Sequence, residues 1–210
     1  MKRRLACSGI AALALGVVCS CGSSSDSGSS GSGGSSGGSS TQLAIVIPPT
    51  TCSTSGFTES VAAVAVLIGD RSISNACTQA TNACISYKNM HAVSLIVSNF
   101  NAAGSTATAV APGTYTIGTL PTSLTGTLAF AGAETTDANC ASSSTSGTPT
   151  GTITISSVSS SQVTGSYNVT VGGTPYSGSI NATVCPISDF TGDICTGAPT
   201  GTCTGTTQCL

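Results

Sequence analysis

The clearest pattern along the chain is a strict alternation of apolar and polar positions between residues 151 and 185. In the run 163–171, odd positions carry Val, Gly or Tyr, and even positions carry Thr, Ser or Asn. The run 176–184 alternates in the same way, and Gly172 and Gly173 lie between the two runs. A period of two with a two-glycine turn predicts an antiparallel hairpin that buries one face.

Shorter apolar or alternating runs predict further strands at 43–47, 63–68, 93–100, 114–117, 124–130 and 151–155. Gly, Pro, Ser and Asn separate these runs, as is typical of an all-β chain. The Ala-rich stretch 60–67 also allows a helix. We therefore expect an all-β domain, an antiparallel β-sandwich or open barrel of about eight short strands.

The first twenty residues have the pattern of an export signal. A positive cluster at 1–4 precedes an apolar run that ends near residue 18. This order is typical of a secretory signal peptide, and the run is shorter than the roughly 20 residues of a membrane-spanning helix.

The end of this segment reads Val18-Cys19-Ser20-Cys21. It resembles the lipobox of bacterial lipoproteins, which has an aliphatic residue three positions before the cysteine and a small residue directly before it. The resemblance implies that residues 1–20 are removed and that Cys21 carries diacylglycerol and an amide-linked fatty acid such as palmitate. Gly22 after the anchor implies sorting to the outer membrane. The alternative is cleavage after Ser20 without a lipid.

Residues 22–40 consist of Gly and Ser with a single Asp26. This composition predicts a disordered linker with an end-to-end distance of roughly 24 Å. The chain then divides into a signal peptide (1–20), a lipidated cysteine with its linker (21–40) and one β-domain (41–210). The domain ends in a Cys-rich segment, 185–210. The part before this segment runs through a Gly-Thr strand, a Val-Thr-Gly strand, a Gly-Gly turn, a Ser-Gly-Ser strand and a cysteine. This pattern resembles one found in uncharacterised bacterial surface lipoproteins, over about 60 residues.

The cysteine count indicates a disulfide-bonded, exported domain. Eleven cysteines are present, of which two leave with the signal and Cys21 is the candidate lipid anchor. The remaining eight pair evenly, and an even number is typical of a disulfide framework. They are Cys52, Cys77, Cys84, Cys140, Cys185, Cys195, Cys203 and Cys209. We expect Cys77 to pair with Cys84, and Cys140 with Cys185. No Cys-x-x-Cys pair occurs, so we expect no metal and no other cofactor.

Charge is scarce in this chain, at 6% of residues. After removal of the signal, Arg71 and Lys88 are the only cations against seven carboxylates, a formal net charge of −5. Binding to phosphate backbones requires clustered Lys and Arg, so we expect no nucleic-acid partner.

Groups suited to catalysis are few. His91 is the only histidine, and no G-x-S-x-G nucleophile motif occurs. Asp189 and Asp193 lie four positions apart, and such a pair of carboxylates suits glycoside hydrolysis, Ca²⁺ binding in a turn or a solvated loop. Glu134 and Asp137 lie in another predicted loop and allow the same interpretations. Tyr167 and Tyr176 fall on predicted buried faces and therefore do not suggest a sugar-binding platform.

Taken together, these features predict a lipid-anchored protein of the cell envelope, not an enzyme. Its domain serves surface display, adhesion or the binding of a protein or glycan partner that the sequence does not identify. The alternative is an envelope hydrolase that uses His91 or the Asp189/Asp193 pair.

Overall fold

The computed structural model describes residues 40–54, 57–80, 85–101, 105–118, 125–186 and 208–210. The predicted signal peptide, Cys21, the linker, and Asp189 with Asp193 lie outside these residues. The main sheet comprises β1 (Thr41–Thr54), β2 (Phe57–Gly69), β4 (His91–Asn101), β5 (Gly113–Thr116), β6 (Thr125–Thr136), β7 (Ser142–Ser144), β8 (Thr150–Val158), β9 (Gln162–Val171) and β10 (Thr174–Val184). A short helix, α2 (Ala76–Ala80), follows β2, and β3 (Ile85–Ser86) pairs with β11 (Gln208–Cys209).

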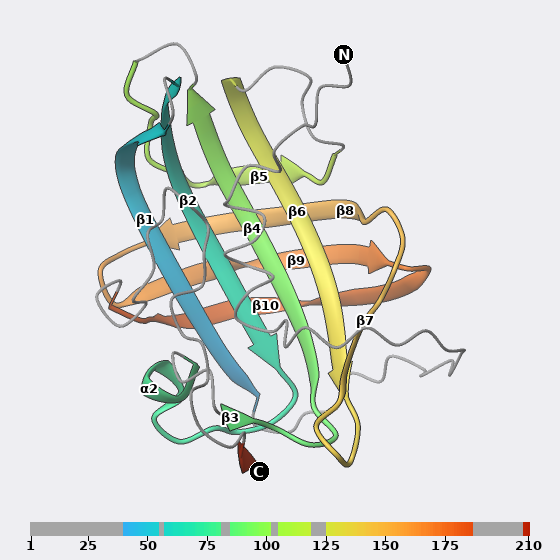
Figure 1. Ribbon diagram of the computed structural model, residues 1–210. Helices are drawn as coiled ribbons and strands as arrows, with labels where there is room; N and C mark the ends of the chain where they lie inside the picture. Colours follow the sequence, from blue (N-terminus) through green and yellow to red (C-terminus); the bar gives the residue numbers. More distant parts are fainter. Residues whose placement is uncertain (1–39, 55–56, 81–84, 102–104, 119–124, 187–207) are drawn as a thin grey trace, which may run out of the picture.

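The nine main strands form one curled sheet in the order β5-β8-β9-β10-β1-β2-β4-β6-β7. The long strands β1, β2, β4 and β6 form one half, and β8, β9 and β10 run across them in a second layer (Figure 1). A parallel pairing of Leu43 with Thr183 and of Ala44 with Val184 joins the halves, and every other pairing in this sheet is antiparallel. The all-β prediction is confirmed as a half-barrel made from a single mixed sheet.

The long strands exceed the predicted lengths, and β1 reaches 14 residues. The register of β1 against β2 shifts between Ile47 and Thr50, where Pro48 and Pro49 interrupt the run. Proline has no N–H to donate to a ladder, so a register shift there lets pairing resume beyond the two prolines. The Ala-rich stretch 60–67 lies within β2, which pairs on both sides, so the helical alternative is wrong.

The predicted hairpin is β9 and β10. Gly172 and Gly173 connect the strands with φ of 57° and 83°. Positive φ at both central residues defines the type I′ turn whose twist suits two-residue hairpins. The cross-strand pairs Tyr176 with Val169 and Ala182 with Val163 place the apolar positions on one face, as predicted.

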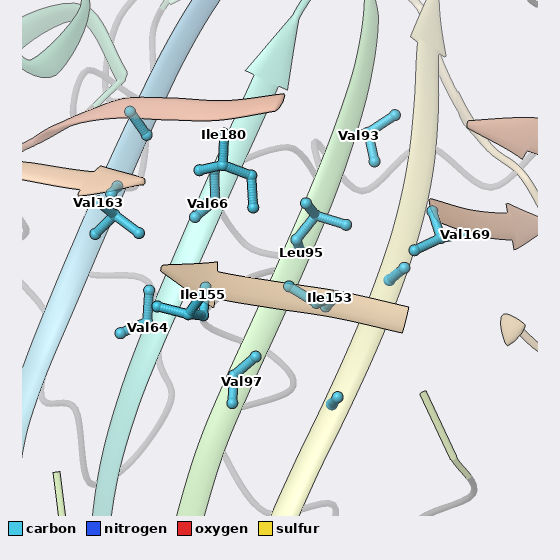
Figure 2. Close-up of a cluster of buried hydrophobic side chains, with 14 of the residues drawn as sticks. Val64, Val66, Val93, Leu95, Val97, Ile153, Ile155, Val163, Val169 and Ile180 are labelled. Atoms are coloured by element: carbon cyan, nitrogen blue, oxygen red, sulfur yellow. The ribbon is translucent and has the colours of Figure 1, made fainter. Parts of the chain in front are cut away.

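The core lies between the two halves of the sheet (Figure 2). One row of cross-strand partners runs Ala44, Val66, Leu95, Ala131. Ile153 and Ile155 of β8 face this row from the second layer, and Leu95 and both isoleucines are at most 2% exposed. Burial of one such side chain contributes about 1.5–3 kcal/mol to folding. Tyr167 and Tyr176 are half-buried and pack against the same cluster, so both face the core as predicted.

Disulfides fasten the domain, but not in the predicted pairs. Cys77 is bonded to Cys185, and Cys140 is bonded to Cys209. The predicted Cys77–Cys84 and Cys140–Cys185 bonds are therefore wrong. The reason is the β1–β10 pairing: the Cys185 N–H donates to the Ala44 carbonyl (2.8 Å), which places its thiol beside α2.

Candidate functional site: the charged end of the sheet

Ionisable side chains gather at one end of the long strands. Seven Asp, Glu, Lys, Arg and His residues fall within the described ranges, and only Glu59 lies near the start of β2. The other six lie where β2 ends, where β4 begins and where β6 ends, which is one end of the sheet because neighbouring strands are antiparallel. We call this group the charged end: Asp70, Arg71, Lys88, His91, Glu134 and Asp137.

Backbone hydrogen bonds hold the turns of the charged end together. The Asp70 N–H donates to the His91 carbonyl, and the His91 N–H donates to Asp70 Oδ1, each at 3.0 Å. The Asn89 N–H donates to the Asp137 carbonyl at 3.0 Å, which joins the β4 side to the turn after β6. The charged side chains therefore stand on three turns that are bonded to one another.

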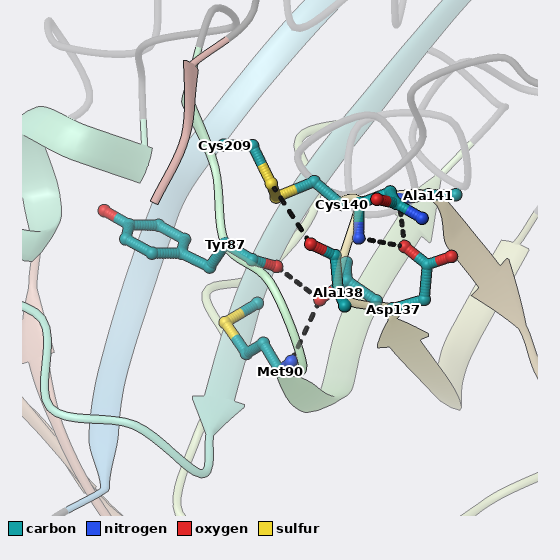
Figure 3. Close-up of a disulfide and its surroundings, with 9 residues drawn as sticks. Tyr87, Met90, Asp137, Ala138, Cys140, Ala141 and Cys209 are labelled. Carbon is teal, nitrogen blue, oxygen red and sulfur yellow. Dashed lines mark hydrogen bonds between the residues drawn. A yellow bond between two sulfur atoms is a disulfide. The ribbon is translucent and has the colours of Figure 1, made fainter.

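The turn after β6 is organised by Asp137 and closed by a disulfide (Figure 3). Asp137 Oδ1 accepts the N–H groups of Asn139 (2.7 Å) and Ala141 (2.9 Å), a local pattern that favours aspartate in turns. Cys140, within this turn, is bonded to Cys209. The bond therefore fixes the last residues of the chain at the charged end.

The C-terminal residues and the segment before β4 add further bonds. The Lys88 N–H donates to the Leu210 carbonyl (2.9 Å), and the Leu210 N–H donates to the Ser86 carbonyl (3.0 Å). Thr136 Oγ1 donates to the Tyr87 carbonyl and accepts the Met90 N–H (Figure 3). The segment that contains Lys88 is therefore fixed by hydrogen bonds to Leu210 on one side and to Thr136 of β6 on the other.

The start of β1 also lies at the charged end. The Thr41 N–H donates to the Arg71 carbonyl (2.9 Å), and the Ile73 N–H donates to Thr41 Oγ1 (2.7 Å). Thr41 is the first residue of the ordered sheet after the Gly/Ser run. The predicted linker therefore joins the domain beside Arg71.

Five of the six side chains at this end are exposed, and Glu134 is the exception. It is 9% exposed, and its Oε1 has no hydrogen-bond partner. Burial raises the pKa of Glu134 from 4.5 to about 7, although a hydrogen bond with Ser142 acts in the opposite direction. Its nearest cross-strand partners are Ala92 and Ser144, which offer no countercharge. This carboxyl is able to exchange a proton near neutral pH.

The predicted catalytic group, His91, is exposed at the first position of β4. The Asp70 carboxylate accepts a hydrogen bond from the backbone N–H of His91, and no hydrogen bond to the imidazole occurs within the described residues. His91 and Asp70 therefore do not form the hydrogen-bonded chain of nucleophile, base and orienting acid that a catalytic triad requires. Within the same part of the chain, no three of His, Cys, Asp and Glu lie close enough together to hold a metal ion.

Sequence reasoning placed Glu134 and Asp137 in one loop and did not predict that both lie at the same end of the sheet as Asp70. A signal was present, because each ionisable residue of the group lies within two residues of a strand end or in the short segment before β4. The burial of Glu134 had no such signal, since it lies near the end of β6 between Ala133 and two threonines.

No protein-family model matches this chain, and comparisons with curated proteins and with solved structures give no match. Within the described ranges, no helix is long and apolar enough to cross a membrane.

Proposed function

We propose that this chain is a lipid-anchored protein of the cell envelope that carries a non-catalytic, partner-binding β-domain. The anchor is Cys21, residues 1–20 are the signal peptide, and residues 22–40 are the spacer. Gly22 at the position after the anchor favours the outer membrane as its location.

The observation that carries the proposal is the oxidation of the domain. Five of the eight predicted disulfide cysteines lie within the described residues, and all five are disulfide-bonded: Cys52, Cys77, Cys140, Cys185 and Cys209. Disulfides persist in oxidising compartments and are rare in the cytosol, so they are compatible with an extracytoplasmic location. Such a location is reached by export, which the pattern of residues 1–20 supports.

The geometry of the domain supports binding over catalysis. Strands and core side chains occupy the space between the two sheet halves, and no carboxylate among the described residues bonds to the imidazole of the exposed His91. The surfaces of β8, β9 and β10 that face away from the core carry Ser, Thr and Asn at successive cross-strand positions. Such an uncharged surface is suited to contact with a partner through hydrogen bonds, and it offers no acid or base.

Metabolic labelling with a radioactive fatty acid tests the anchor in the intact protein. We expect label in the wild-type chain and in Cys19→Ser, the matched control two residues earlier, and no label in Cys21→Ser. The first two proteins remain with membranes after a carbonate wash, and Cys21→Ser does not. Equal labelling of Cys21→Ser and wild type would overturn the proposal.

A further inference from the structure

We propose that Cys52 is bonded to Cys195 and that Cys84 is bonded to Cys203, which completes the disulfide framework of the domain. The inference rests on the proposed lipid on Cys21, because that lipid leaves eight cysteines to pair among themselves. It goes beyond the proposed function, because it assigns two covalent bonds that tie the C-terminal segment to both ends of the long strands.

The starting point is the bonded state of Cys52. This residue is disulfide-bonded, as are Cys77, Cys140, Cys185 and Cys209. The other four form two bonds with one another, Cys77 with Cys185 and Cys140 with Cys209. The partner of Cys52 is therefore one of the three remaining cysteines, which lie outside the described residues.

Cys52 lies far from the charged end. It pairs with Glu59 of β2, and the next cross-strand row joins Ser60 through β4 to Thr125, the first residue of β6. Thr136, the last residue of β6, lies at the charged end, eleven positions after Thr125. At about 3.3 Å per residue, the two ends of the long strands are roughly 36 Å apart.

Distance excludes Cys84 as the partner of Cys52. Cys84 lies three positions before Tyr87, whose carbonyl accepts a hydrogen bond from Thr136 Oγ1. Three residues span at most about 11 Å, so Cys84 stays at the charged end, more than about 15 Å from Cys52. A disulfide requires two Cα atoms within about 7 Å of each other.

Distance also excludes Cys203. It lies six positions before Cys209, and six residues span at most about 22 Å. The Cα of Cys209 is 5.7 Å from that of Cys140, in the turn beyond β6 (Figure 3). From this turn, Cys52 is roughly 36 Å away along the strands and three strand spacings, about 14 Å, across the sheet. Cys203 therefore stays more than about 10 Å from Cys52.

Cys195 is within reach of Cys52. The Cys185 N–H donates to the carbonyl of Ala44, which lies eight positions before Cys52 on β1, a distance of roughly 27 Å. The ten residues from Cys185 to Cys195 span up to about 36 Å. The fourteen residues from Cys195 to Cys209 span up to about 50 Å, which allows the return to the charged end.

The second bond follows by elimination and by proximity. Cys84 directly precedes Ile85, which pairs with Gln208 in the small parallel sheet. Cys203 lies five positions before Gln208, and five residues span up to about 18 Å. The reach of Cys203 therefore includes Cys84.

The burial of the face that carries Cys52 supports the first bond. Cys52 packs against Val61 and Phe100, on the face of the long strands that points away from the core. Ile47 and Ala63 are cross-strand partners on the same face, and both are buried. This face is therefore not open to solvent, and a chain tied at Cys185 and at Cys52 accounts for its burial.

Each bond forms by the two-electron oxidation of two thiols, and the oxidant is a disulfide of an exported thiol oxidoreductase. One cysteine thiolate attacks that disulfide, breaks its S–S bond and forms a mixed disulfide. The second thiolate then displaces the oxidant sulfur. The domain gains one S–S bond, and the two electrons and two protons of its thiols leave on the oxidant as a dithiol.

Peptide mapping of the oxidised, lipidated full-length protein tests both bonds. Thr200→Lys adds a trypsin site between Cys195 and Cys203, and N-ethylmaleimide blocks free thiols before digestion. Trypsin is combined with a protease that cuts before aspartate, and the peptides are separated without a reductant. We expect peptide 26–69, which holds Cys52, to be bonded to peptide 193–200 alone. The other cysteine peptides should form one three-membered complex: 72–88, 137–188 and 201–210.

Each alternative gives a different product. A bond from peptide 26–69 to peptide 72–88 or to peptide 201–210 would overturn the assignment and leave the lipid anchor intact. A bond from peptide 26–69 to peptide 21–25 would show that Cys21 is a disulfide partner, and it would overturn the anchor as well.

Two serine variants repeat the test without the added lysine. Cys195→Ser leaves Cys52 without its partner, so alkylation after unfolding without a reductant should label peptide 26–69. Cys203→Ser, the matched control eight positions later, should label peptide 72–88 instead. The reverse pattern of labelling would overturn the assignment.

Discussion

The buried carboxyl of Glu134 makes the stability of the domain depend on pH in a defined direction. Its pKa is raised from 4.5 to about 7 in the fold, because burial penalises the charged form. The fold therefore accommodates the protonated carboxyl, and below about pH 4.5 this group costs the domain no free energy of unfolding. This stability is lost as pH rises through about 7, where the folded protein must either ionise a buried group or open.

The magnitude follows from the same shift. One pKa unit corresponds to about 1.36 kcal/mol. A shift from 4.5 to about 7 therefore limits the loss of unfolding free energy at high pH to about 3.4 kcal/mol. The pKa of about 7 already includes the opposing Ser142 hydrogen bond, and the remaining contact with water stabilises the ionised form further. We therefore expect about half of this limit, ~1.5–2 kcal/mol.

Urea unfolding at pH 5 and pH 8, followed by circular dichroism with disulfides intact, measures this effect. Wild type should lose about 1.5–2 kcal/mol more between these pH values than Glu134→Gln, whose amide does not titrate. Glu59→Gln, the same change at a half-buried position of β2, is the control and should lose as much stability as wild type does. If Glu134→Gln and wild type lose equal stability, the carboxyl is not held in its protonated form by burial and the reasoning is refuted.

Two further changes test the fold by thermal and urea unfolding. Replacing Cys77 and Cys185 together by Ala opens a bond that spans 108 residues, and we expect a loss of about 3–5 kcal/mol; no loss would contradict its structural role. Gly165→Ala places a Cβ 2.0 Å from a carbonyl oxygen of β8, so we expect a loss above about 2 kcal/mol. Gly118→Ala, with nothing within 4 Å, is its control, and equal stability of the two variants would refute the clash.

The β9–β10 hairpin was predictable because its determinants are local. Alternation with a period of two fixes which side chains face the core, and Gly172-Gly173 fixes the turn type and with it the register. The same reasoning predicted that Tyr167 and Tyr176 face the core, where both are half-buried. It underestimated strand length, since the polar and proline-containing ends of β1 extend well beyond its apolar run.

The disulfide pairs were not predictable because they depend on long-range contacts. Cys77 lies seven positions from Cys84 but bonds to Cys185, which the parallel pairing of β10 with β1 brings to the same end of the sheet. Nothing in the local pattern near residue 185 specifies a parallel partner 140 positions earlier. Eight cysteines allow 105 pairings, and topology selects among them.

The charged end was predictable only in part, unlike the hairpin, which was predictable, and the disulfide pairs, which were not. Polar residues at strand ends were visible in the sequence, but their meeting depends on strand order and direction. Arg71 and Lys88 share one end only because β2 and β4 are antiparallel neighbours. The relation of that end to the linker depends on the start of β1, beside Arg71.

The mass of the intact protein extracted from membranes tests the central claim most directly. The account predicts a chain of residues 21–210 that carries a diacylglyceryl group and an added acyl chain, with its eight other cysteines oxidised. Alkylation after unfolding without a reductant should therefore add no mass. A chain that begins at Met1, a chain that begins at Cys21 without lipid, or a free thiol on Cys21 would contradict it.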